Sequence, residues 1–511
     1  MILDGETLNI EDLYNYSKKA LDPAFQCEIS FSESAIKKMK ASEDFVKNIV
    51  QGEKAVYGIN TGFGRFAEVK ISATDLELLQ DNIIKSHACG MGEPLQRDIV
   101  MAMWLMRLNV VARGNSGVQK NTLNGILDFL KAGFLAEIPS RGSVGASGDL
   151  CPSSHAVLAY LGDGMASIPA GSSFQKKPAK EILNKLEKKP LKLGPKEGLA
   201  LINGTQLSTV LAVFALQELK HLIHVANLSA AMMVEGLRGS HQITHSKTLQ
   251  SKNQEGTVFC GNEMRLWLTE NGALTEIARS HVDCGRVQDA YSLRCAPVVH
   301  GALWDEILGC ENILNRELNS STDNPLIFAE SSESLSGGNF HAIYPARVSD
   351  RLASAAATLA SISERRIALA MNADSSRLPT FLIKDGGLNS GYMMIHVTAA
   401  ALASEAKTNS FPASVDTIPT NDDREDHVSM GPTAGYRALK NIELARQVLA
   451  IELMTASQAI DLLRPLKSSP SLERAHQWIR TQAPYMEKDI SLSDAMNKVA
   501  DLIKSDIPQR T

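Results

Sequence analysis

Apolar residues recur at helical spacing along much of the chain. Within residues 75–132 the pattern includes Ile99, Met103, Met106 and Val110, which would form one face of a helix. Further long patterns of the same period cover residues 204–234, 349–371, 391–407 and 434–463. Glycine and proline fall between these patterns, as at Pro325 and at 337–338, 386–387 and 431–432. The sequence therefore predicts a mainly α fold, a bundle of long helices in which any sheet is a minor element.

The composition changes between residues 168 and 195, where lysine, proline and glycine become frequent. This change predicts a solvated excursion at the surface. We expect residues 1–200 to form an N-terminal region that carries the candidate site loops. Residues 201–511 would form the long-helix bundle and a C-terminal helical region, with both regions in one continuous structural unit.

The composition of the 511 residues is that of an ordinary globular protein, with 44% hydrophobic residues, 21% charged residues and a net charge of −5. It points to no nucleic acid partner. The seven cysteines are scattered, without a Cys-x-x-Cys pair, and suit a reducing cytoplasm. The N-terminus is acidic where a secretory signal would be basic. Polar residues at 217–218 and 220–221 interrupt the apolar stretches, so we expect no membrane span.

The stretch of the chain with the most unusual chemistry is residues 142–150, Gly-Ser-Val-Gly-Ala-Ser-Gly-Asp-Leu. Small residues of this kind commonly form a turn. A serine nucleophile elbow would need glycine where Asp149 stands, which weakens a hydrolase reading. Because Gly148 has no Cβ, its nitrogen could approach the Ala146 carbonyl. Cyclisation with loss of water from the ring and from Ser147 would then give an electrophilic imidazolone, so a turn and an electrophile both remain open.

Several other polar residues stand in loops between the helical patterns, and each has a structural alternative. His87 could be a satisfied structural histidine, and Asn203 could be a helix cap. Arg294 could bind a carboxylate in bidentate fashion or form a structural salt bridge. His241 and His245 have the spacing of a metal pair but lack the glutamate of a zinc motif, so we predict no metal site there.

Read together, these segments resemble the aromatic amino acid ammonia-lyases. The matching stretches are residues 56–64, 142–150, 201–206, 288–294, 322–326, 336–341 and 425–430, and they occur in the order found in that family. The resemblance implies the ammonia-lyase architecture, which combines a bundle of long central helices with a smaller mixed N-terminal globular region. It also implies a homotetramer in which the subunits share the active sites.

The resemblance assigns roles to particular residues of this chain. Ala146, Ser147 and Gly148 would become a methylidene-imidazolone group autocatalytically, so no external cofactor would be needed. This group would be the electron sink that a poorly acidic β-proton and a poor amine leaving group require. Tyr57 would be the catalytic base. The other implied site residues are Asn203 beside the prosthetic group, Tyr291 and Gln288 lining the site, Arg294 as the carboxylate clamp and Phe340 as an aromatic wall.

His87 and Glu425 bear on the choice of substrate. An imidazole has two nitrogens that need polar partners, and the sequence Glu-Asp-His-Val-Ser-Met at 425–430 favours L-histidine over phenylalanine. The resemblance then implies elimination of ammonia from L-histidine to give trans-urocanate in histidine degradation. The alternatives are a tyrosine or phenylalanine ammonia-lyase, a 2,3-aminomutase with the same prosthetic group, and an inactive helical scaffold.

Overall fold

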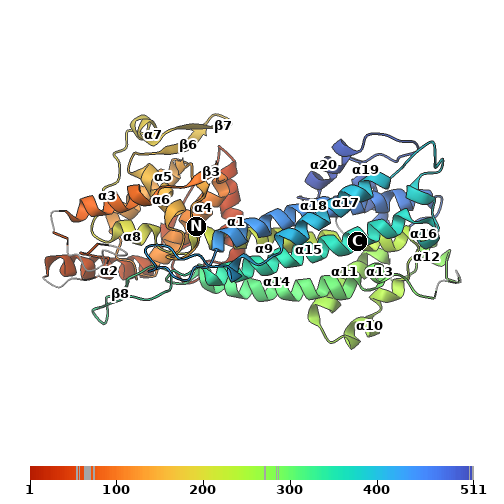
Figure 1. Cartoon of the computed structure of the whole chain (residues 1–511), viewed down its shortest axis with the longest axis horizontal. Coiled ribbons are helices and arrows are strands. Elements are labelled where there is room, and N and C mark those ends of the chain that lie inside the picture. Colours follow the sequence, from red (N-terminus) through yellow and green to blue (C-terminus); the bar gives the residue numbers. More distant parts are fainter. Residues whose placement is uncertain are drawn as a thin grey trace. The chain divides into compact units, whose positions relative to one another are not determined.

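The protein is described by a computed structural model, shown in Figure 1. The model describes all residues except 53–55, 57, 63–70, 73–74, 270–271, 283–284, 286, 506 and 509–511. The predicted long helices are confirmed: α9 (Gln206–Gly236), α15 (Ile343–Met371), α17 (Met393–Asn409) and α18 (Gly431–Leu462) coincide with the four apolar patterns. The pattern within residues 75–132 forms three helices, α3 (Leu76–His87), α4 (Arg97–Ala112) and α5 (Lys120–Lys131).

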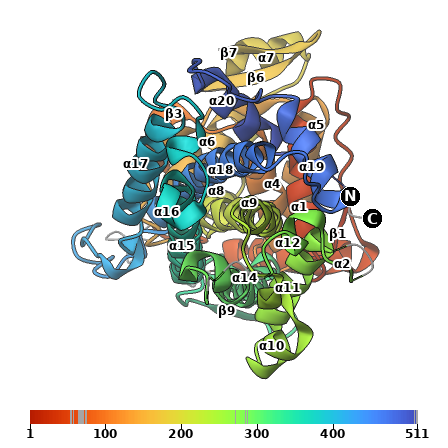
Figure 2. The same ribbon diagram turned by 90° about the vertical axis from the view of Figure 1, so that its right-hand side faces the viewer.

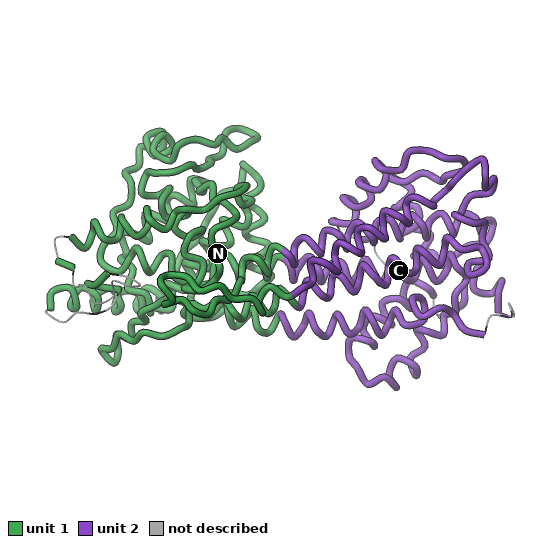
Figure 3. The backbone as a smooth tube through the Cα atoms, in the orientation of Figure 1, with its two compact units in different colours: residues 1–214, 311–350, 412–436 green, residues 215–310, 351–411, 437–511 purple. Residues whose placement is uncertain are grey.

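The chain divides into two compact units, coloured separately in Figure 3. Unit 1 comprises Met1–Phe214, Glu311–Asp350 and Pro412–Tyr436, and unit 2 comprises Ala215–Cys310, Arg351–Phe411 and Arg437–Thr511. The boundaries between the segments of the two units fall after residues 214, 310, 350, 411 and 436. The predicted N-terminal region lies wholly within unit 1, which also takes two later segments, because their packing depends on contacts between residues far apart in the chain.

Unit 1 contains short helices and all of the strands in the described residues. Its helices, besides α3, α4 and α5, are α1 (Ile10–Lys18), α2 (Glu33–Gln51), α6 (Leu150–Tyr160), α7 (Ala179–Lys185), α8 (Glu197–Ile202) and the 3₁₀ turns η1 (Lys19–Leu21) and η5 (Ala413–Val415). Its strands are β1 (Ile2–Leu3), β2 (Ser30–Phe31), β3 (Met91–Pro94), β4 (Leu135–Ala136), β5 (Pro139–Arg141), β6 (Met165–Ala170), β7 (Ser173–Pro178), β8 (Leu326–Phe328) and β9 (Glu333–Leu335).

These strands form four small sheets, which confirms the prediction that any sheet is a minor element. The pairs are β1 with β2, β3 with β5, and β8 with β9, and the three-stranded sheet has the order β4-β6-β7. The antiparallel β6–β7 hairpin, with Met165 opposite Pro178, and helix α7 form the first part of the lysine-rich excursion. This part is regular structure: Ile168 on β6 is buried, whereas Lys176 on β7 is exposed and pairs with Glu137 at 2.6 Å.

The described residues of unit 2 form helices and the loops that connect them, without a named strand. Four helices have residues in both units, namely α9, α15, α18 and α14 (Ala296–Leu318). The remaining helices of unit 2, besides α17, are α10 (Ser246–Ser251), α11 (Glu255–Leu268), α12 (Glu276–Arg279), α13 (Tyr291–Arg294), α16 (Ala373–Ser376), α19 (Pro470–Arg480), α20 (Ser493–Leu502) and the 3₁₀ turns η3 (His241–Thr244) and η4 (Thr380–Leu382).

Within unit 2, α9 is the central helix, and Figure 2 shows it nearly end-on among α14, α15 and α18. Small residues allow close packing: a Cβ added at Gly236 of α9 would lie 2.9 Å from the Ala459 Cβ of α18. Asn441 of α18 donates to the carbonyl oxygens of Ala353 on α15 and Ala406 on α17, each at 3.0 Å. The bundle is therefore held by apolar burial together with buried side-chain hydrogen bonds between helices, such as those of the Asn441 Nδ2.

One helix in the described part of the chain is long and apolar enough to cross a membrane by composition alone. This helix is α9, whose most apolar window has a mean hydropathy of 1.2. Protein atoms bury 72% of that window, which is typical of a core helix rather than of a lipid-facing one.

Candidate active site

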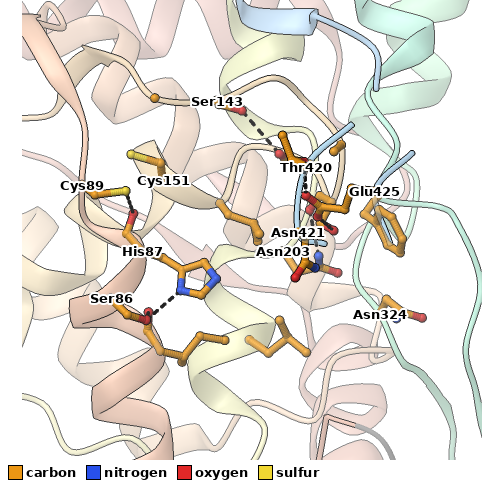
Figure 4. Close-up of a pocket in the computed structure, with 18 of the residues that line it drawn as sticks. Ser86, His87, Cys89, Ser143, Cys151, Asn203, Asn324, Thr420, Asn421 and Glu425 are labelled. Atoms are coloured by element: carbon orange, nitrogen blue, oxygen red, sulfur yellow. Dashed lines mark hydrogen bonds between the residues drawn. The ribbon is translucent and has the colours of Figure 1, made fainter. Parts of the chain in front are cut away.

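Unit 1 contains a cavity of about 920 Å³ whose lining comes from five separate parts of the chain. The predicted site residues that line it are His87, Ala146, Ser147, Gly148, Asn203, Phe340 and Glu425. Figure 4 shows His87 on one side of this cavity and Asn203 with Glu425 on the other. The structure thus brings together seven residues that the sequence separates by more than three hundred positions.

The small-residue stretch forms an irregular loop between β5 and α6, and it packs closely against the backbone at Gly204. Gly148 has a φ of +78°, and a Cβ placed on it would lie 2.1 Å from the Gly204 carbonyl oxygen. The amide of Asp149 donates to that same oxygen at 2.6 Å. Only glycine at position 148 allows both this backbone conformation and this approach.

Asn203, the residue before Gly204, forms a hydrogen bond with the Ala146-Ser147-Gly148 triad. It follows α8, and its side-chain Nδ2 donates to the Ser147 carbonyl oxygen at 2.8 Å. Its Oδ1 has no hydrogen-bond partner among the described residues, although Asn203 is only 3% exposed. A buried acceptor without a partner at a cavity wall is well suited to receive a hydrogen bond from a ligand.

Glu425 faces the triad from a loop near the start of α18. Its Oε1 accepts a hydrogen bond from the Ser147 hydroxyl, and its Oε2 accepts one from the Thr420 hydroxyl at 2.7 Å. The loop turns through three consecutive residues with positive φ, 421–423, which are Asn and Asp. These residue types tolerate the left-handed region better than most, so the turn can point the carboxylate into the cavity.

His87 ends α3 on the other side of the cavity. Its Nδ1 lies 3.0 Å from the Ser86 hydroxyl. Burial lowers the pKa of His87, although the Ile83 backbone and the Glu425 carboxylate act in the opposite direction. The imidazole is therefore neutral near pH 7 and can act as a hydrogen-bond donor or acceptor toward a ligand.

Asp149 and Arg107 are two buried charged residues next to the site that the sequence analysis did not select as site residues. Burial raises the pKa of Asp149 to about 6, although its carboxylate accepts from the Ser208 amide at 2.7 Å and from the Ser143 hydroxyl at 3.1 Å. Arg107 donates to the Asn203 carbonyl oxygen at 2.7 Å. A charged residue inside an otherwise apolar helical pattern was the signal that could have singled out Arg107.

Three predicted site residues in the described part of the chain do not line this cavity: Gln288, Tyr291 and Arg294. Tyr57 lies outside the described residues. Gln288, Tyr291 and Arg294 belong to unit 2, where the last two stand on α13 and the Arg294 guanidinium carbon lies 4.8 Å from the Tyr291 ring centroid. Gln288 is exposed and Tyr291 is 71% exposed, so both side chains are accessible for contacts outside their own unit.

Comparison with known proteins agrees with this fold. The profile of the aromatic amino acid lyase family matches residues 8–481. The histidine ammonia-lyase of Myxococcus xanthus is 41% identical over 505 residues, which cover 99% of this chain and 97% of that protein. The chain therefore belongs to the aromatic amino acid lyase family, and it is an ammonia-lyase.

Two solved structures show how far the fold is shared. Histidine ammonia-lyase from Trypanosoma cruzi has a TM-score of 0.88 and 38% identity, covering 98% of this chain and 93% of that one. Tyrosine aminomutase from Streptomyces globisporus has a TM-score of 0.90 and 29% identity, covering 99% and 97%. The fold is thus common to lyases and aminomutases, and the choice between the reactions depends on the site.

We expect Gly204→Ala to destabilise the site more than an ordinary glycine substitution does. A Cβ at Gly204, whose φ is +141°, would lie 2.6 Å from the Thr322 hydroxyl and 3.0 Å from an Arg107 nitrogen. Backbone strain and overpacking should together cost about 2 kcal/mol or more. Denaturant unfolding followed by circular dichroism measures this loss.

The matched control is Gly171→Ala in the β6–β7 turn of the same unit. Gly171 has a φ of +65°, but a Cβ there meets nothing within 4 Å. Its substitution should cost only the strain of the left-handed backbone, about 1 kcal/mol. Equal losses for the two variants would contradict the close packing described around Gly204.

Proposed function

We propose that this protein is a histidine ammonia-lyase, which eliminates ammonia from L-histidine to give trans-urocanate in histidine degradation. The observation that carries the proposal is the presence of His87 and Glu425 on the same cavity as the Ala146-Ser147-Gly148 triad. A neutral imidazole and a carboxylate provide the hydrogen-bonding groups that an imidazole side chain needs. The relatives named histidine ammonia-lyase support the same choice of substrate.

The triad fits the methylidene-imidazolone group that this reaction would use. Gly148 has no Cβ and packs against the Gly204 carbonyl, Ser147 points its hydroxyl to the cavity residue Glu425, and Asn203 holds the Ser147 carbonyl. We propose that Ala146, Ser147 and Gly148 form this group autocatalytically, with no external cofactor. The group, once formed, supplies the electrophile that makes an amino acid's amine a better leaving group and its β-proton more acidic.

The other cavity residues would bind and orient the substrate. The free Oδ1 of Asn203 would accept a hydrogen bond from the substrate amine, and Phe340 would form an aromatic wall. His87 and Glu425 would hold the two imidazole nitrogens, so that phenylalanine would leave their polar atoms without partners. Tyr57 would remove the β-proton as a phenolate, which requires a pKa lowered by the site.

We also propose that the active enzyme is a homotetramer with shared active sites. Gln288, Tyr291 and Arg294 do not line the unit 1 cavity. Gln288 and Tyr291 are exposed and Arg294 is half-buried, which leaves them accessible to another copy of the chain. Arg294 would clamp the substrate carboxylate in bidentate fashion. Tyr291 and Gln288 would complete the lining of the site.

A cytoplasmic location is part of the same proposal. The six cysteines in the described residues are free thiols, which suits a reducing compartment. Cys89 and Cys151 both line the cavity, so a reducing environment would also keep the cavity wall in its thiol form.

The direct test of the proposal is a product assay of the purified protein with L-histidine, L-tyrosine and L-phenylalanine. We expect urocanate and ammonia from L-histidine, and little turnover of the other two. β-Histidine as the product would identify an aminomutase instead. Turnover of tyrosine or phenylalanine in preference to histidine would contradict the roles of His87 and Glu425, and no turnover at all would favour an inactive scaffold.

Glu425→Gln tests the contribution of the carboxylate to substrate choice. Loss of a charged hydrogen bond to the imidazole should lower kcat/KM for L-histidine about 10- to 100-fold. Asp426→Asn makes the same chemical change at an exposed neighbouring position and should alter kcat/KM less than about twofold. If Glu425→Gln turned over histidine as fast as the Asp426→Asn control, this result would contradict the role of Glu425 in substrate choice.

A further inference from the structure

A second, much smaller cavity lies within unit 1, where α4, α6 and the start of α9 meet. It leaves about 10 Å³ for the centre of a water-sized sphere. Its polar lining residues are Trp104, Arg107, Ser153 and Gln206, and the rest of the lining is apolar. This small cavity has no residue in common with the lining of the 920 Å³ cavity.

Each polar lining residue of the small cavity has a buried side-chain atom without a hydrogen-bond partner in the described part of the chain. The atoms are Trp104 Nε1, Arg107 Nε, Ser153 Oγ and both Oε1 and Nε2 of Gln206. The four residues are between 1% and 4% exposed. Folded proteins rarely leave so many buried polar atoms unsatisfied around one cavity, because each costs free energy that only a hydrogen bond recovers.

Arg107 connects this small cavity to the candidate active site. Its Nε has no hydrogen-bond partner in the described part of the chain. Its Nη1 donates to the carbonyl oxygens of Ala200 and Asn203, both at 2.7 Å. These two carbonyls define the end of α8, from which the Asn203 side chain reaches Ser147. The orientation of one guanidinium therefore sets the position of the turn that presents Asn203.

The Arg107 guanidinium remains charged in this setting. Burial lowers the pKa of Arg107 to about 10, and the Asp323 carboxylate opposes that effect. Asp323 also pairs with the fully buried Lys196 at 2.6 Å. At pH 7 the Nε–H of Arg107 is therefore a charged donor, and charged donors are the most costly to bury without an acceptor.

The size and chemistry of the cavity decide which ligand it can hold. A single water needs roughly 10–15 Å³ of this kind of space, together with two to four polar partners. Arg107 Nε and Trp104 Nε1 can only donate, whereas the Ser153 hydroxyl and the Gln206 carbonyl oxygen can accept. Water accepts two hydrogen bonds and donates two, while an anion could not satisfy the Gln206 carbonyl oxygen.

We propose that the small cavity binds one internal water molecule, which accepts from Arg107 and Trp104, donates to Ser153 and Gln206, and fixes the guanidinium that positions Asn203. The binding of the water stands independently of the enzyme's substrate. Its effect on turnover, through Asn203, rests on the proposed function. Arg107 is in this account a positioning residue, because it acts on the reacting groups only through Asn203.

A high-resolution crystal structure of the full-length, processed protein tests the water site directly. We expect one solvent peak in the small cavity, about 2.7–3.2 Å from Arg107 Nε and from Gln206 Oε1. Absence of the peak would overturn the proposal. A bromide soak distinguishes the occupant: an anomalous peak in this cavity would show a halide site and contradict water, and a cavity without one supports it.

Gln206→Met tests the positioning role, since it keeps the side-chain length and removes both polar atoms. We expect the solvent peak to disappear and the distance from Asn203 Nδ2 to the Ser147 carbonyl oxygen to lengthen beyond its present 2.8 Å. The fold decrease in kcat should be about ten times the fold increase in KM. The absorbance of the prosthetic group should persist. A lost peak with an unchanged Asn203 position would refute the positioning role, and this crystallographic result is independent of which amino acid the enzyme uses.

Ser154→Ala is the matched control for Gln206→Met. Ser154 is fully buried on α6 beside Ser153, its hydroxyl also has no partner among the described residues, and it lines neither cavity. We expect this variant to retain the solvent peak and to change kcat less than about twofold at temperatures well below unfolding. An equal loss of kcat in both variants would show that a general loss of packing in unit 1 lowers kcat. This result would overturn the specific role of the water.

Discussion

The contact between the backbone at Gly148 and the carbonyl of Gly204 constrains the rest of the site. A side chain at position 148 would overlap that oxygen, and the Asp149 amide uses the same oxygen as its acceptor. This contact joins the small-residue loop to the turn between α8 and α9, so that Ser147 and Asn203 meet. This close backbone packing therefore fixes the positions of Ser147 and Asn203 in the absence of substrate.

Buried charges beneath this contact keep the turn in place. Arg107 holds the carbonyls at the end of α8, Lys196 pairs with Asp323, and Asp149 accepts hydrogen bonds from Ser208. Such groups are costly to bury and are tolerated when each has partners in a fixed geometry. They offer little net stability relative to apolar packing, but they allow few alternative arrangements of the loop. This rigidity is the preorganisation that a reaction with a poor leaving group requires.

Periodicity predicted the long helices correctly because α9, α15, α17 and α18 bury apolar faces with few interruptions. It could not predict the β6–β7 hairpin, whose lysines hide the strand pattern. The cavity grouping of His87, Asn203 and Glu425 came from resemblance, since contacts across hundreds of residues leave no local signal. The roles assigned to those residues stay predictions. The small polar cavity beside Arg107 could not be predicted from the sequence, because no local pattern shows that Trp104, Ser153 and Gln206 line one cavity.

We propose that the packing around Gly148 serves a processed triad rather than a simple turn. The most direct measurement is the mass of the intact purified protein, followed by the mass of the proteolytic peptide that contains residues 146–148. We expect both masses to be lower than the sequence requires by two water molecules, one lost on ring closure and one from the Ser147 side chain. An intact protein and a peptide at their full sequence masses would contradict the claim and return residues 142–150 to the status of a structural turn.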